Sequence, residues 1–485
     1  MNNILNKELK KTKIIATLGP ATGTKKIIKN LIIAGVDVFR INFSHADYDL
    51  VTKNVTLIRE LNEEMGTSVG ILGDLQGPKL RVGVVKEGSY LNPGDILTFT
   101  NQKMEGDSTM VYMTYQNFPN DVKVGERILI DDGKLALEVI ETNQKDTVRA
   151  KTLQGGPLSS KKGVNLPNTN VSLPALTEKD IEDANFMMDL ELDWIALSFV
   201  RHAQDIRDLK ELMAKHPKGK IKTPIIAKIE KPEGVKNIDQ ILLECDGLMV
   251  ARGDLGVEVP MEEVPAIQKT LVERARFFSK PVIIATQMME TMINSLTPTR
   301  AEVNDVANSV LDGADAVMLS GETSVGRYPV EVVENMTKIV KNIEKTHFYQ
   351  GKNEPIEKEY SCIDERFVTN RVCLAAVRIA KTTEVEAIIT LTNSGYTAFQ
   401  ISAHRPNSHI IVFSSNKRVI TMLNLLWGVR AYYYTDEVGT DKTIIKVNKI
   451  AKELGFVEET DFVINLNATP ANEHGKTNTL RLTTI

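Results

Sequence analysis

The sequence predicts an α/β protein: a closed (β/α)8 TIM barrel, a β-rich lid domain inserted after the third barrel strand, and a C-terminal α/β domain. Three observations support this. Short β-branched runs alternate with helical patterns in two separate stretches of the chain. The stretch between them, residues 78–172, changes to strand-like alternation. The length of 485 residues, at roughly 150 residues per domain, allows about three domains.

The first three barrel strands are expected before residue 78. Each is a short apolar run, and the helical pattern after the first one ends before Gly35. Strands that alternate with helices indicate a parallel sheet. The three runs are KIIATLGP from residue 13, DVFRINFSH from 37 to 45 and GILGDL from 70 to 75.

Five further strands are expected after residue 172, and three plus five close a barrel of eight. Helix signals separate them, for example Thr299 with Glu302, a capping box that opens a helix ending near Gly313. The five runs are DWIALSF (193–199), PIIAKIE (224–230), DGLMVARGD (246–254), PVIIATQM (281–288) and DAVMLSGET (315–323).

The inserted and C-terminal segments have different textures. In the insertion, Asp132-Gly133 within RILIDDGKLALEVIE is a hairpin signal. Residues 346–363 lose periodicity and are expected to form a linker. The C-terminal strands are expected at 387–392, 408–413, 428–434 and 461–466. The expected units are 1–77 (barrel, first part), 78–172 (lid), 173–348 (barrel, second part) and 349–485 (C-terminal regulatory domain).

Composition excludes several classes of protein. The three cysteines form no CxxC pair and no disulfide framework, which favours a reducing, cytoplasmic location. A net charge of -4 argues against a general nucleic-acid binder. Residues 1–15 lack the apolar run and the small-residue cleavage site of a signal peptide, and no eighteen apolar residues are consecutive, so we expect no export and no membrane partner.

Polar residues close almost every expected barrel strand, at the end where barrels of this type form active sites. A single Lys and Glu two residues apart is more often a structural ion pair, but eight coincidences favour a site. Arg40, Asn42 and Ser44 should project to one side if the strand period of two continues. The residues, in strand order, are Arg40, Asn42, Ser44, Asp74, Ser198, Lys228, Glu230, Asp254, Thr286 and Glu322.

Glu230 and Asp254 are expected on neighbouring strands, where their carboxylates can share one cation. Oxygen ligands favour Mg²⁺ or Mn²⁺, and the seven histidines show no zinc spacing. Lys228 and Arg40 would concentrate positive charge for a phosphoryl group. The residues therefore indicate metal-assisted phosphoryl or enolate chemistry. The Gly475-Lys476-Thr477 sequence is no P-loop, because Pro470 stands where its first glycine should be.

The chain resembles the pyruvate kinase family from end to end. The resemblance rests on KIIATLGP, RINFSH (40–45), AKIEKPEG (227–234), MVARGDLGVE (249–258), IATQMMETM (284–292) and ADAVMLSGETSVGRYP (314–329). It implies the last step of glycolysis, in which the phosphoryl group of phosphoenolpyruvate passes to ADP to give ATP and pyruvate. It also implies the barrel, lid and C-terminal arrangement that periodicity predicts independently.

The resemblance implies a role for each matching residue. Lys228 would neutralise the phosphoryl group in flight, and Arg40 would grip the same phosphate. Glu230 and Asp254 would bind Mg²⁺, with the substrate carboxylate at Gly253 and Asp254. Thr286 would help to protonate the enolate, through water because a threonine hydroxyl is a weak acid.

Nucleotide and cation positions follow from the same resemblance. Asn42, His45, Arg81 and Lys162 match positions near ADP, and lid closure would expel water. For Lys162, spacing alone would favour a solvated loop charge. A pocket for a monovalent cation would be formed by Asn42, Ser44 and Asp74. Potassium-requiring relatives carry glutamate at Lys79 and threonine at Leu75, so we expect that K⁺ is not required and that Lys79 supplies the charge.

In the C-terminal domain, TLTNSGYTA (390–398) matches a loop that relatives use for phosphorylated effectors. Thr392, Ser394, Gly395 and Thr397 would cradle the phosphate, and an ordinary helix cap is the alternative.

The family is usually a homotetramer. Two other functions stay open: a metal-dependent lyase or aldolase acting on a pyruvate enolate, and a barrel that only senses a metabolite. A lyase would not need Lys228, Arg81 or the lid.

Overall fold

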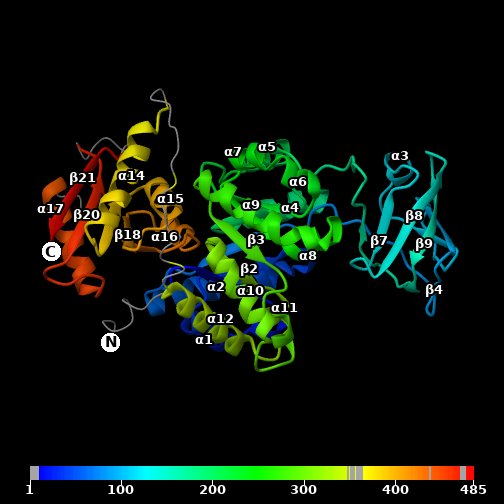
Figure 1. The fold of residues 1–485 in the computed structure, drawn as a ribbon, viewed down its shortest axis with the longest axis horizontal. Helices are drawn as coiled ribbons and strands as arrows, with labels where there is room; N and C mark the ends of the chain where they lie inside the picture. The colour runs from blue at the N-terminus through cyan, green and yellow to red at the C-terminus, as the bar shows by residue number, and fades with distance from the viewer. Residues whose placement is uncertain (1–9, 347–348, 350–355, 357–363, 436–438, 470–476) are drawn as a thin grey trace.

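The computed structural model places three units in a row, with the C-terminal domain at one end, the barrel in the middle and the lid at the other end (Figure 1). It describes residues 10–346, 349, 356, 364–435, 439–469 and 477–485. Most of the expected linker at 346–363 lies outside the described residues. No helix in the described part of the chain is long and apolar enough to cross a membrane.

Eight parallel strands close the central barrel, which confirms the predicted fold class. Each strand is a short buried run, and the closed order is β1-β16-β15-β14-β13-β12-β3-β2. Their carboxyl ends therefore meet at one rim, where the polar residues follow. The strands are β1 Lys13–Thr17, β2 Val38–Asn42, β3 Gly70–Asp74, β12 Trp194–Leu197, β13 Ile225–Ile229, β14 Gly247–Ala251, β15 Val282–Ala285 and β16 Ala316–Leu319.

Helices between the strands cover the outside of the barrel (Figure 1). The capping box at α10 is confirmed: Thr299 Oγ1 accepts from Glu302 N at 3.2 Å, and Thr299 N donates to Glu302 Oε2 at 2.8 Å. Gly313 ends this helix, as predicted. The helices are α1 Lys25–Ala34, α2 Tyr48–Met65, α4 Glu178–Asp189, α5 Ala203–Lys215, α6 Pro232–Lys236, α7 Ile238–Glu244, α8 Arg252–Glu258, α9 Val264–Phe277, α10 Arg300–Asp312, α11 Gly321–Ser324 and α12 Pro329–Glu344, with 3-10 turns η1 Pro20–Thr22, η2 Phe43–His45, η3 Met261–Glu263 and η4 Glu290–Ile293.

The lid is a separate β unit with its own apolar core. Its main sheet has the order β11-β7-β8-β9-β5-β6, and β4 pairs with β10. The predicted hairpin at Asp132-Gly133 joins β7 to β8, and both residues have positive φ. The elements are β4 Tyr90–Leu91, β5 Ile96–Thr100, β6 Met110–Tyr112, α3 Phe118–Asp121, β7 Arg127–Ile130, β8 Leu135–Thr142, β9 Thr147–Gln154, β10 Gly156–Pro157 and β11 Val164–Asn165.

The C-terminal domain is a five-stranded sheet with helices. The four expected strands are present, and the sequence analysis missed β21, an antiparallel edge strand paired with β20. Its exposed residues lack the apolar run that marked the other strands. The elements are β17 Ala387–Leu391, β18 His409–Ser414, β19 Val429–Tyr433, β20 Phe462–Asn467, β21 Thr479–Thr484, α14 Phe367–Thr382, α15 Tyr396–Ala403, α16 Lys417–Leu423 and α17 Thr440–Glu453.

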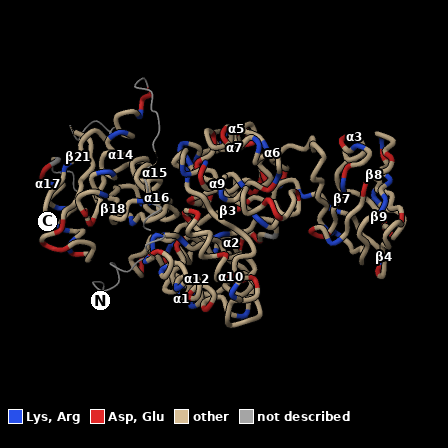
Figure 2. The backbone as a smooth tube through the Cα atoms, viewed as in Figure 1, with Lys and Arg blue, Asp and Glu red and all other residues tan. Residues whose placement is uncertain are grey.

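Helix α16 of the C-terminal domain packs against the amino-terminal end of the barrel. Trp194, at the start of β12, donates its indole N–H to Met422 O at 3.0 Å. Arg418 donates to Leu192 O at 2.9 Å. The rim of polar residues at the carboxyl ends of the strands therefore lies at the opposite end of the barrel from the C-terminal domain. Positive and negative side chains are interleaved along all three units (Figure 2).

Candidate active site

Lys228 lies at the centre of the polar rim. It is on β13 and is 8% exposed. Its Nζ lies 3.1 Å from Asp74 Oδ1 and 3.0 Å from Glu230 Oε1, and it donates to Ser198 Oγ at 2.6 Å. Burial lowers the pKa of Lys228, but the Asp74 and Glu230 carboxylates outweigh burial and the net shift is upward. The lysine therefore carries its positive charge inside the site.

Arg40 and Asp74 form the second part of this charged cluster. Arg40, on β2, donates from Nε to Asp74 Oδ2 at 2.7 Å and from a terminal nitrogen to Thr17 Oγ1 at 3.2 Å. Asp74 is 1% exposed at the end of β3. Burial would raise its pKa, but Lys228 and Arg40 outweigh that effect and hold the pKa of Asp74 below its usual value. Asp74 is thus the shared counter-ion of both cations.

Glu230 and Asp254 approach each other, but not from two strand ends. Strand β14 ends at Ala251, and Asp254 lies in the first turn of α8, so the prediction of a strand position for Asp254 was wrong. A carboxylate is stabilised in a first helical turn, because the free backbone N–H groups there carry partial positive charge. Glu230 Oε2 accepts from Phe199 N at 2.8 Å, which fixes its orientation.

The donor set fits a divalent cation. Burial raises the pKa of Glu230, and the Asp254 charge adds to this rise while Lys228 opposes it. The two carboxylates therefore repel each other, and a bound cation would relieve the repulsion. Within the described ranges no three His, Cys, Asp or Glu side chains are grouped to hold a metal. Two carboxylates would leave the remaining positions of an octahedral Mg²⁺ to water and substrate.

Thr286 and Gly253 meet on the other side of the rim. The sequence analysis placed Thr286 within the strand, but β15 ends at Ala285. Thr286 therefore follows the strand, and the predicted strand position was wrong. Its φ of 70° is unusual for a β-branched residue and indicates local backbone strain. Gly253 N donates to Thr286 Oγ1 at 2.7 Å, and a Cβ at Gly253 would lie only 3.2 Å from that oxygen. The close approach requires glycine or an outward shift.

Asn42 and Ser44 do not lie on the same strand, so the expected projection of both side chains to one side of β2 was wrong. Asn42 ends β2 beside Asp74 in the strand register, whereas Ser44 lies in η2. Asn42 Oδ1 accepts from Ser44 N at 3.1 Å and caps this turn, which is the physical reason why the strand pattern stops there. His45 is in the same turn, and its side chain lies outside the described residues.

The lid residues are not gathered with the barrel cluster. Arg81 donates to Lys161 O within the lid at 2.8 Å. Lys162 pairs with Asp131 at 2.9 Å and is 40% exposed. Hydrogen bonding to Lys162 lowers the pKa of Asp131. Both cations are therefore engaged by the lid itself in this conformation.

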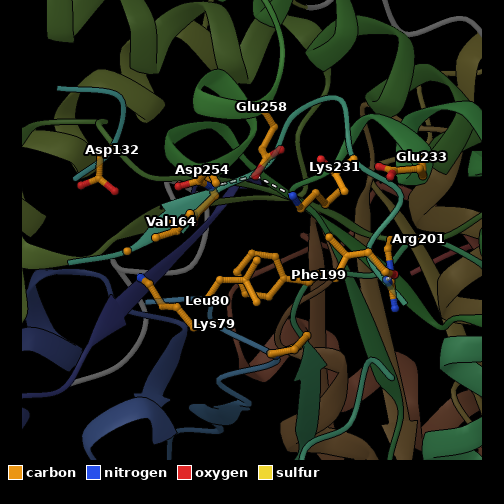
Figure 3. A pocket seen from close by; sticks show the side chains of 15 residues that line it. Lys79, Leu80, Asp132, Val164, Phe199, Arg201, Lys231, Glu233, Asp254 and Glu258 are labelled. Atoms are coloured by element: carbon orange, nitrogen blue, oxygen red, sulfur yellow. Dashed lines mark hydrogen bonds and ion pairs between the residues drawn. The ribbon is translucent and has the colours of Figure 1, made fainter. Parts of the chain in front are cut away.

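A cleft of roughly 610 Å³ lies between the lid and the barrel, and part of it is open to solvent. Figure 3 shows Glu258 and Lys231 pointing toward each other there, with Asp254 close to Glu258. Glu258 Oε1 lies 2.6 Å from Lys231 Nζ and accepts from Asn165 Nδ2 of the lid at 2.8 Å. The exposed Lys79 lines the same cleft, and its side chain has no ion-pair partner among the residues described.

Sequence reasoning missed several residues that shape this site. Lys231 and Glu258 stood within quoted motifs, but neither follows a strand directly. Arg201 donates to Val171 O and Leu173 O at 2.5 Å each, so it fixes the segment that connects the lid back to the barrel. Ser198 was noted at a strand end without a role. Glu322 accepts from Met289 N at 3.2 Å and Ser320 N at 2.7 Å, so its carboxylate serves the backbone.

The expected effector loop has the geometry of a helix start. Gly395 has a φ of 83° and is the N-cap of α15. Thr392 Oγ1 accepts from Gly395 N at 2.9 Å, and the buried Thr397 hydroxyl lies 2.9 Å from Thr477 Oγ1. Ser394 is exposed. Of the hydroxyls in this loop, that of Ser394 is the most accessible to a ligand.

The fold and the rim together define an enzyme of phosphoryl or enolate chemistry: a (β/α)8 barrel with a β lid, in which the buried Lys228 and the half-buried Arg40 share Asp74 beside Glu230 and Asp254. Family profiles described as "Pyruvate kinase, barrel domain" and "Pyruvate kinase, alpha/beta domain" match residues 9–333 and 370–483. The chain belongs to the pyruvate kinase family. It is a phosphotransferase that transfers the phosphoryl group of phosphoenolpyruvate to ADP, giving pyruvate and ATP in glycolysis.

Relatives match over nearly the whole chain. A protein named pyruvate kinase 2 from Synechocystis is 42% identical over 98% of this chain and 79% of its own length. A pyruvate kinase from Mycobacterium intracellulare is 40% identical, with 97% of each chain covered. The crystal structure of a pyruvate kinase from Cryptosporidium parvum is similar with a TM-score of 0.91 and 34% identity, covering 99% of this chain and 98% of its own.

Proposed function

We propose that Lys228 and Arg40 carry the phosphoryl transfer. The supporting observation is the buried cluster in which Asp74 lies 3.1 Å from Lys228 Nζ and 2.7 Å from Arg40 Nε. Both cations are held in place before substrate binds, so little reorganisation is needed when negative charge develops on the phosphoryl oxygens. Arg40 would bind the phosphate of phosphoenolpyruvate, and Lys228 would follow the phosphoryl group toward ADP.

Glu230 and Asp254 are the residues that would hold the divalent cation that the family generally uses, Mg²⁺ or Mn²⁺. When bound, this cation supplies electrostatic stabilisation to the oxygens of the substrate. The substrate carboxylate would lie at Gly253 and the start of α8, where Gly253 N would exchange its present acceptor, Thr286 Oγ1, for a carboxylate oxygen. Ser198 would keep the Lys228 ammonium oriented through its 2.6 Å hydrogen bond.

Thr286 would participate in protonating the pyruvate enolate. Its Oγ accepts from Gly253 N and lies 2.6 Å from Ala285 O, so the hydroxyl proton points to the backbone in this conformation. A water molecule bound at the hydroxyl would deliver the proton to the methylene carbon, because threonine itself is too weak an acid.

The lid would close over the nucleotide. Asn42, His45, Arg81 and Lys162 are the proposed ADP residues, and the last two would exchange their lid partners, Lys161 O and Asp131, for phosphate oxygens. Exclusion of water from the cleft would strengthen each electrostatic interaction with the transferring group.

The monovalent-cation pocket would be formed by Asn42, Ser44 and Asp74. We propose that K⁺ is not required, because Lys79 supplies a fixed positive charge and has no ion-pair partner in the described part of the chain.

We also propose the limits 1–77, 78–172, 173–348 and 349–485 for the units, a homotetrameric assembly and a cytoplasmic location.

Thr392, Ser394, Gly395 and Thr397 would bind the phosphate of an allosteric effector. The exposed Ser394 hydroxyl and the amides at the start of α15 support this role. Ser394→Glu should remove any response to phosphorylated metabolites and leave basal turnover unchanged. Kinetic titration with a panel of sugar phosphates and nucleotides tests this. If no metabolite shifts the wild-type kinetics, the loop is only a helix cap.

A coupled assay tests the function as a whole. Pyruvate formation from phosphoenolpyruvate is measured with ADP present or omitted, and in Mg²⁺ or in chelator. We expect turnover that requires both ADP and the divalent cation. Pyruvate release without ADP would favour the lyase or aldolase alternative, and an inert protein that still binds phosphoenolpyruvate would favour a metabolite sensor.

A further inference from the structure

A second cavity lies between the barrel and the C-terminal domain, at the amino-terminal end of the barrel strands. It encloses roughly 1150 Å³, part of it open to solvent. One wall is formed by α9 and the end of α10, and the other by Arg405, which follows α15. None of its lining residues belongs to the active rim or to the 392–397 loop.

Two guanidinium groups on the walls of this cavity carry N–H donors without acceptors. Arg276 Nε and Arg405 Nε are both buried and have no hydrogen-bond partner among the described residues. Arg405 is 1% exposed, and its terminal nitrogens are used by Asp315, at 2.7 Å, and by Gly313 O, at 2.8 Å. A buried donor without an acceptor is costly, so an anion that supplies acceptors to both groups would be stabilised here.

Every cation that lines the cavity, except Arg276, is paired with a carboxylate, and Arg405 is paired with Asp315. Lys269 pairs with Asp312, and Arg274 makes a two-bond contact to Asp239 at 2.7 Å. Arg276 forms no ion pair or hydrogen bond through its side chain with any residue that the structure describes. Burial and then the nearby Arg405 charge lower the pKa of Arg276 to about 10. An anion between the two arginines would relieve this repulsion.

The geometry of the donors favours a phosphate group over a carboxylate. A single guanidinium fork satisfies a planar carboxylate. Here the two free N–H groups come from different domains, so an acceptor with oxygens in more than one plane is needed to reach both. A position of Arg276 in the last turn of α9 is also favourable for the helix dipole, but this does not supply acceptors for the two N–H groups.

We propose that this cavity is a binding site for a small phosphate-bearing anion, held by Arg276 of the barrel and Arg405 of the C-terminal domain. The ligand would bridge the two domains, and the site is distinct from the loop at Thr392 and Ser394. A phosphomonoester would place its phosphate between the arginines and its organic part toward Tyr349 and Phe277, which also line the cavity.

Trp427 provides a local reporter. It is buried, its Nε1 donates to Tyr349 Oη at 2.6 Å, and the Arg405 guanidinium lies 5.0 Å from its ring centroid. The chain has two tryptophans, so Trp194→Phe makes Trp427 the sole emitter. This protein is titrated with inorganic phosphate, and with chloride at matched ionic strength, while Trp427 fluorescence is recorded. If Trp194→Phe does not fold, the same titration is made on the wild-type chain.

We expect a saturable change with phosphate that chloride does not produce. Arg276→Gln should weaken the apparent affinity at least tenfold, whereas Arg274→Gln, the same charge change on the same helix at an already paired arginine, should shift it about twofold or less. Ser394→Glu should leave the titration unchanged. The proposal is overturned if phosphate gives no saturable change, if Arg276→Gln binds as the parent does, or if Ser394→Glu abolishes the signal.

Discussion

At the scale of single residues, the active rim is organised by one buried carboxylate. Asp74 is within ion-pair distance of both Lys228 and Arg40, so the two cations that would meet a phosphoryl group share a counter-ion. Two positive charges face two carboxylates, Asp74 and Glu230, so a divalent cation that engages Glu230 would leave net positive charge for an anionic substrate. The Glu230 carboxylate balances Lys228 until a divalent cation competes for it.

Lys228→Met should reduce turnover by at least about 10³-fold, the typical loss when one transition-state donor is removed. The reason is that methionine keeps the shape of the side chain but removes the charge beside the transferring group. The measurement is kcat in the coupled assay, with circular dichroism to verify the fold. Lys236→Met, on an exposed helix position, is the control and should be unchanged. A Lys228→Met enzyme within tenfold of the wild type would contradict this role.

Lys79→Glu should create a K⁺ requirement that the wild type lacks. A glutamate adds a negative charge at an exposed position lining the lid–barrel cleft, and a bound cation would balance it. Initial rates are compared in tetramethylammonium buffer with and without KCl at matched ionic strength. Lys123→Glu, another exposed lid lysine, is the control. The idea fails if the wild type gains more than about tenfold from K⁺, near 1.4 kcal/mol, or if Lys79→Glu stays indifferent.

The identity of the rim residues could be predicted from strand ends, but their surroundings could not. Lys228 and Arg40 follow from apolar runs closed by a charge. The positions of Asp254 and Thr286 were wrong by one element, because a helix starts at Arg252 and the backbone turns to positive φ at Thr286. Such turns depend on contacts made across the barrel, for example Gly253 N to Thr286 Oγ1, which periodicity cannot reveal.

At the scale of elements, two contacts fix the lid in its present position. Asn165, on β11, donates to Glu258 at the end of α8, and Arg201 holds the chain where it leaves the lid. Glu258 is 4% exposed, and its second oxygen has no hydrogen-bond partner among the described residues. Helix α8 therefore carries Asp254 at its start and the lid contact at its end, so a movement of the lid would be transmitted to Asp254 through this helix.

Asn165→Ala should loosen the lid. Loss of one hydrogen bond to a buried carboxylate costs about 1.5 to 3 kcal/mol and leaves Glu258 with one fewer donor. We expect faster hydrogen exchange in residues 160–167 and a several-fold higher KM for ADP, with kcat less affected. Asn168→Ala is the matched control, because the Asn168 side chain accepts from Arg127 N inside the lid. Equal exchange and KM in both variants would show that this contact does not set the lid.

The elements themselves were more predictable than their connections. Eight buried runs and the Thr299 capping box are local signals, and the structure contains them. Strand β21 was missed because its side chains are partly or fully exposed and its partner β20 lies before it in the chain. Pairing at a sheet edge is a tertiary event, and exposed residues leave no hydrophobic pattern.

At the scale of the whole molecule, the barrel and C-terminal domain are joined through a buried charge cluster. Asp37, at the start of β2, pairs with Lys10 and lies 3.3 Å from Arg430 of the C-terminal domain and 3.9 Å from Lys13 Nζ. Ile14 N donates to the same carboxylate at 2.9 Å. One buried carboxylate is thus the ion-pair partner of three basic residues from two units, so the contact between the two domains depends on the protonation of Asp37.

Burial alone would raise the pKa of Asp37, but the Lys10, Lys13 and Arg430 charges outweigh burial and lower it to about 2, from an ordinary value of 3.8. A carboxyl group whose pKa is lower in the folded state stabilises the fold above the unfolded pKa. This stability is lost as the pH falls through the folded value. The shift corresponds to about 2 kcal/mol. Burial also lowers the pKa values of Lys10 and Lys13, and the Asp37 charge opposes this shift in both lysines.

Asp37→Asn should therefore lower the free energy of unfolding by at least about 2 kcal/mol at neutral pH, because two buried lysines and the half-buried Arg430 lose their partner. The difference from the wild type should stay constant down to about pH 4 and shrink between pH 3.8 and about 2, where the wild-type carboxyl protonates. Urea unfolding across this pH range, followed by the combined emission of Trp194 and Trp427, measures this difference. Asp208→Asn, at an exposed position, should show a small and pH-independent difference. An Asp37→Asn difference that is equally independent of pH would show that the Asp37 charge does not hold the two domains together.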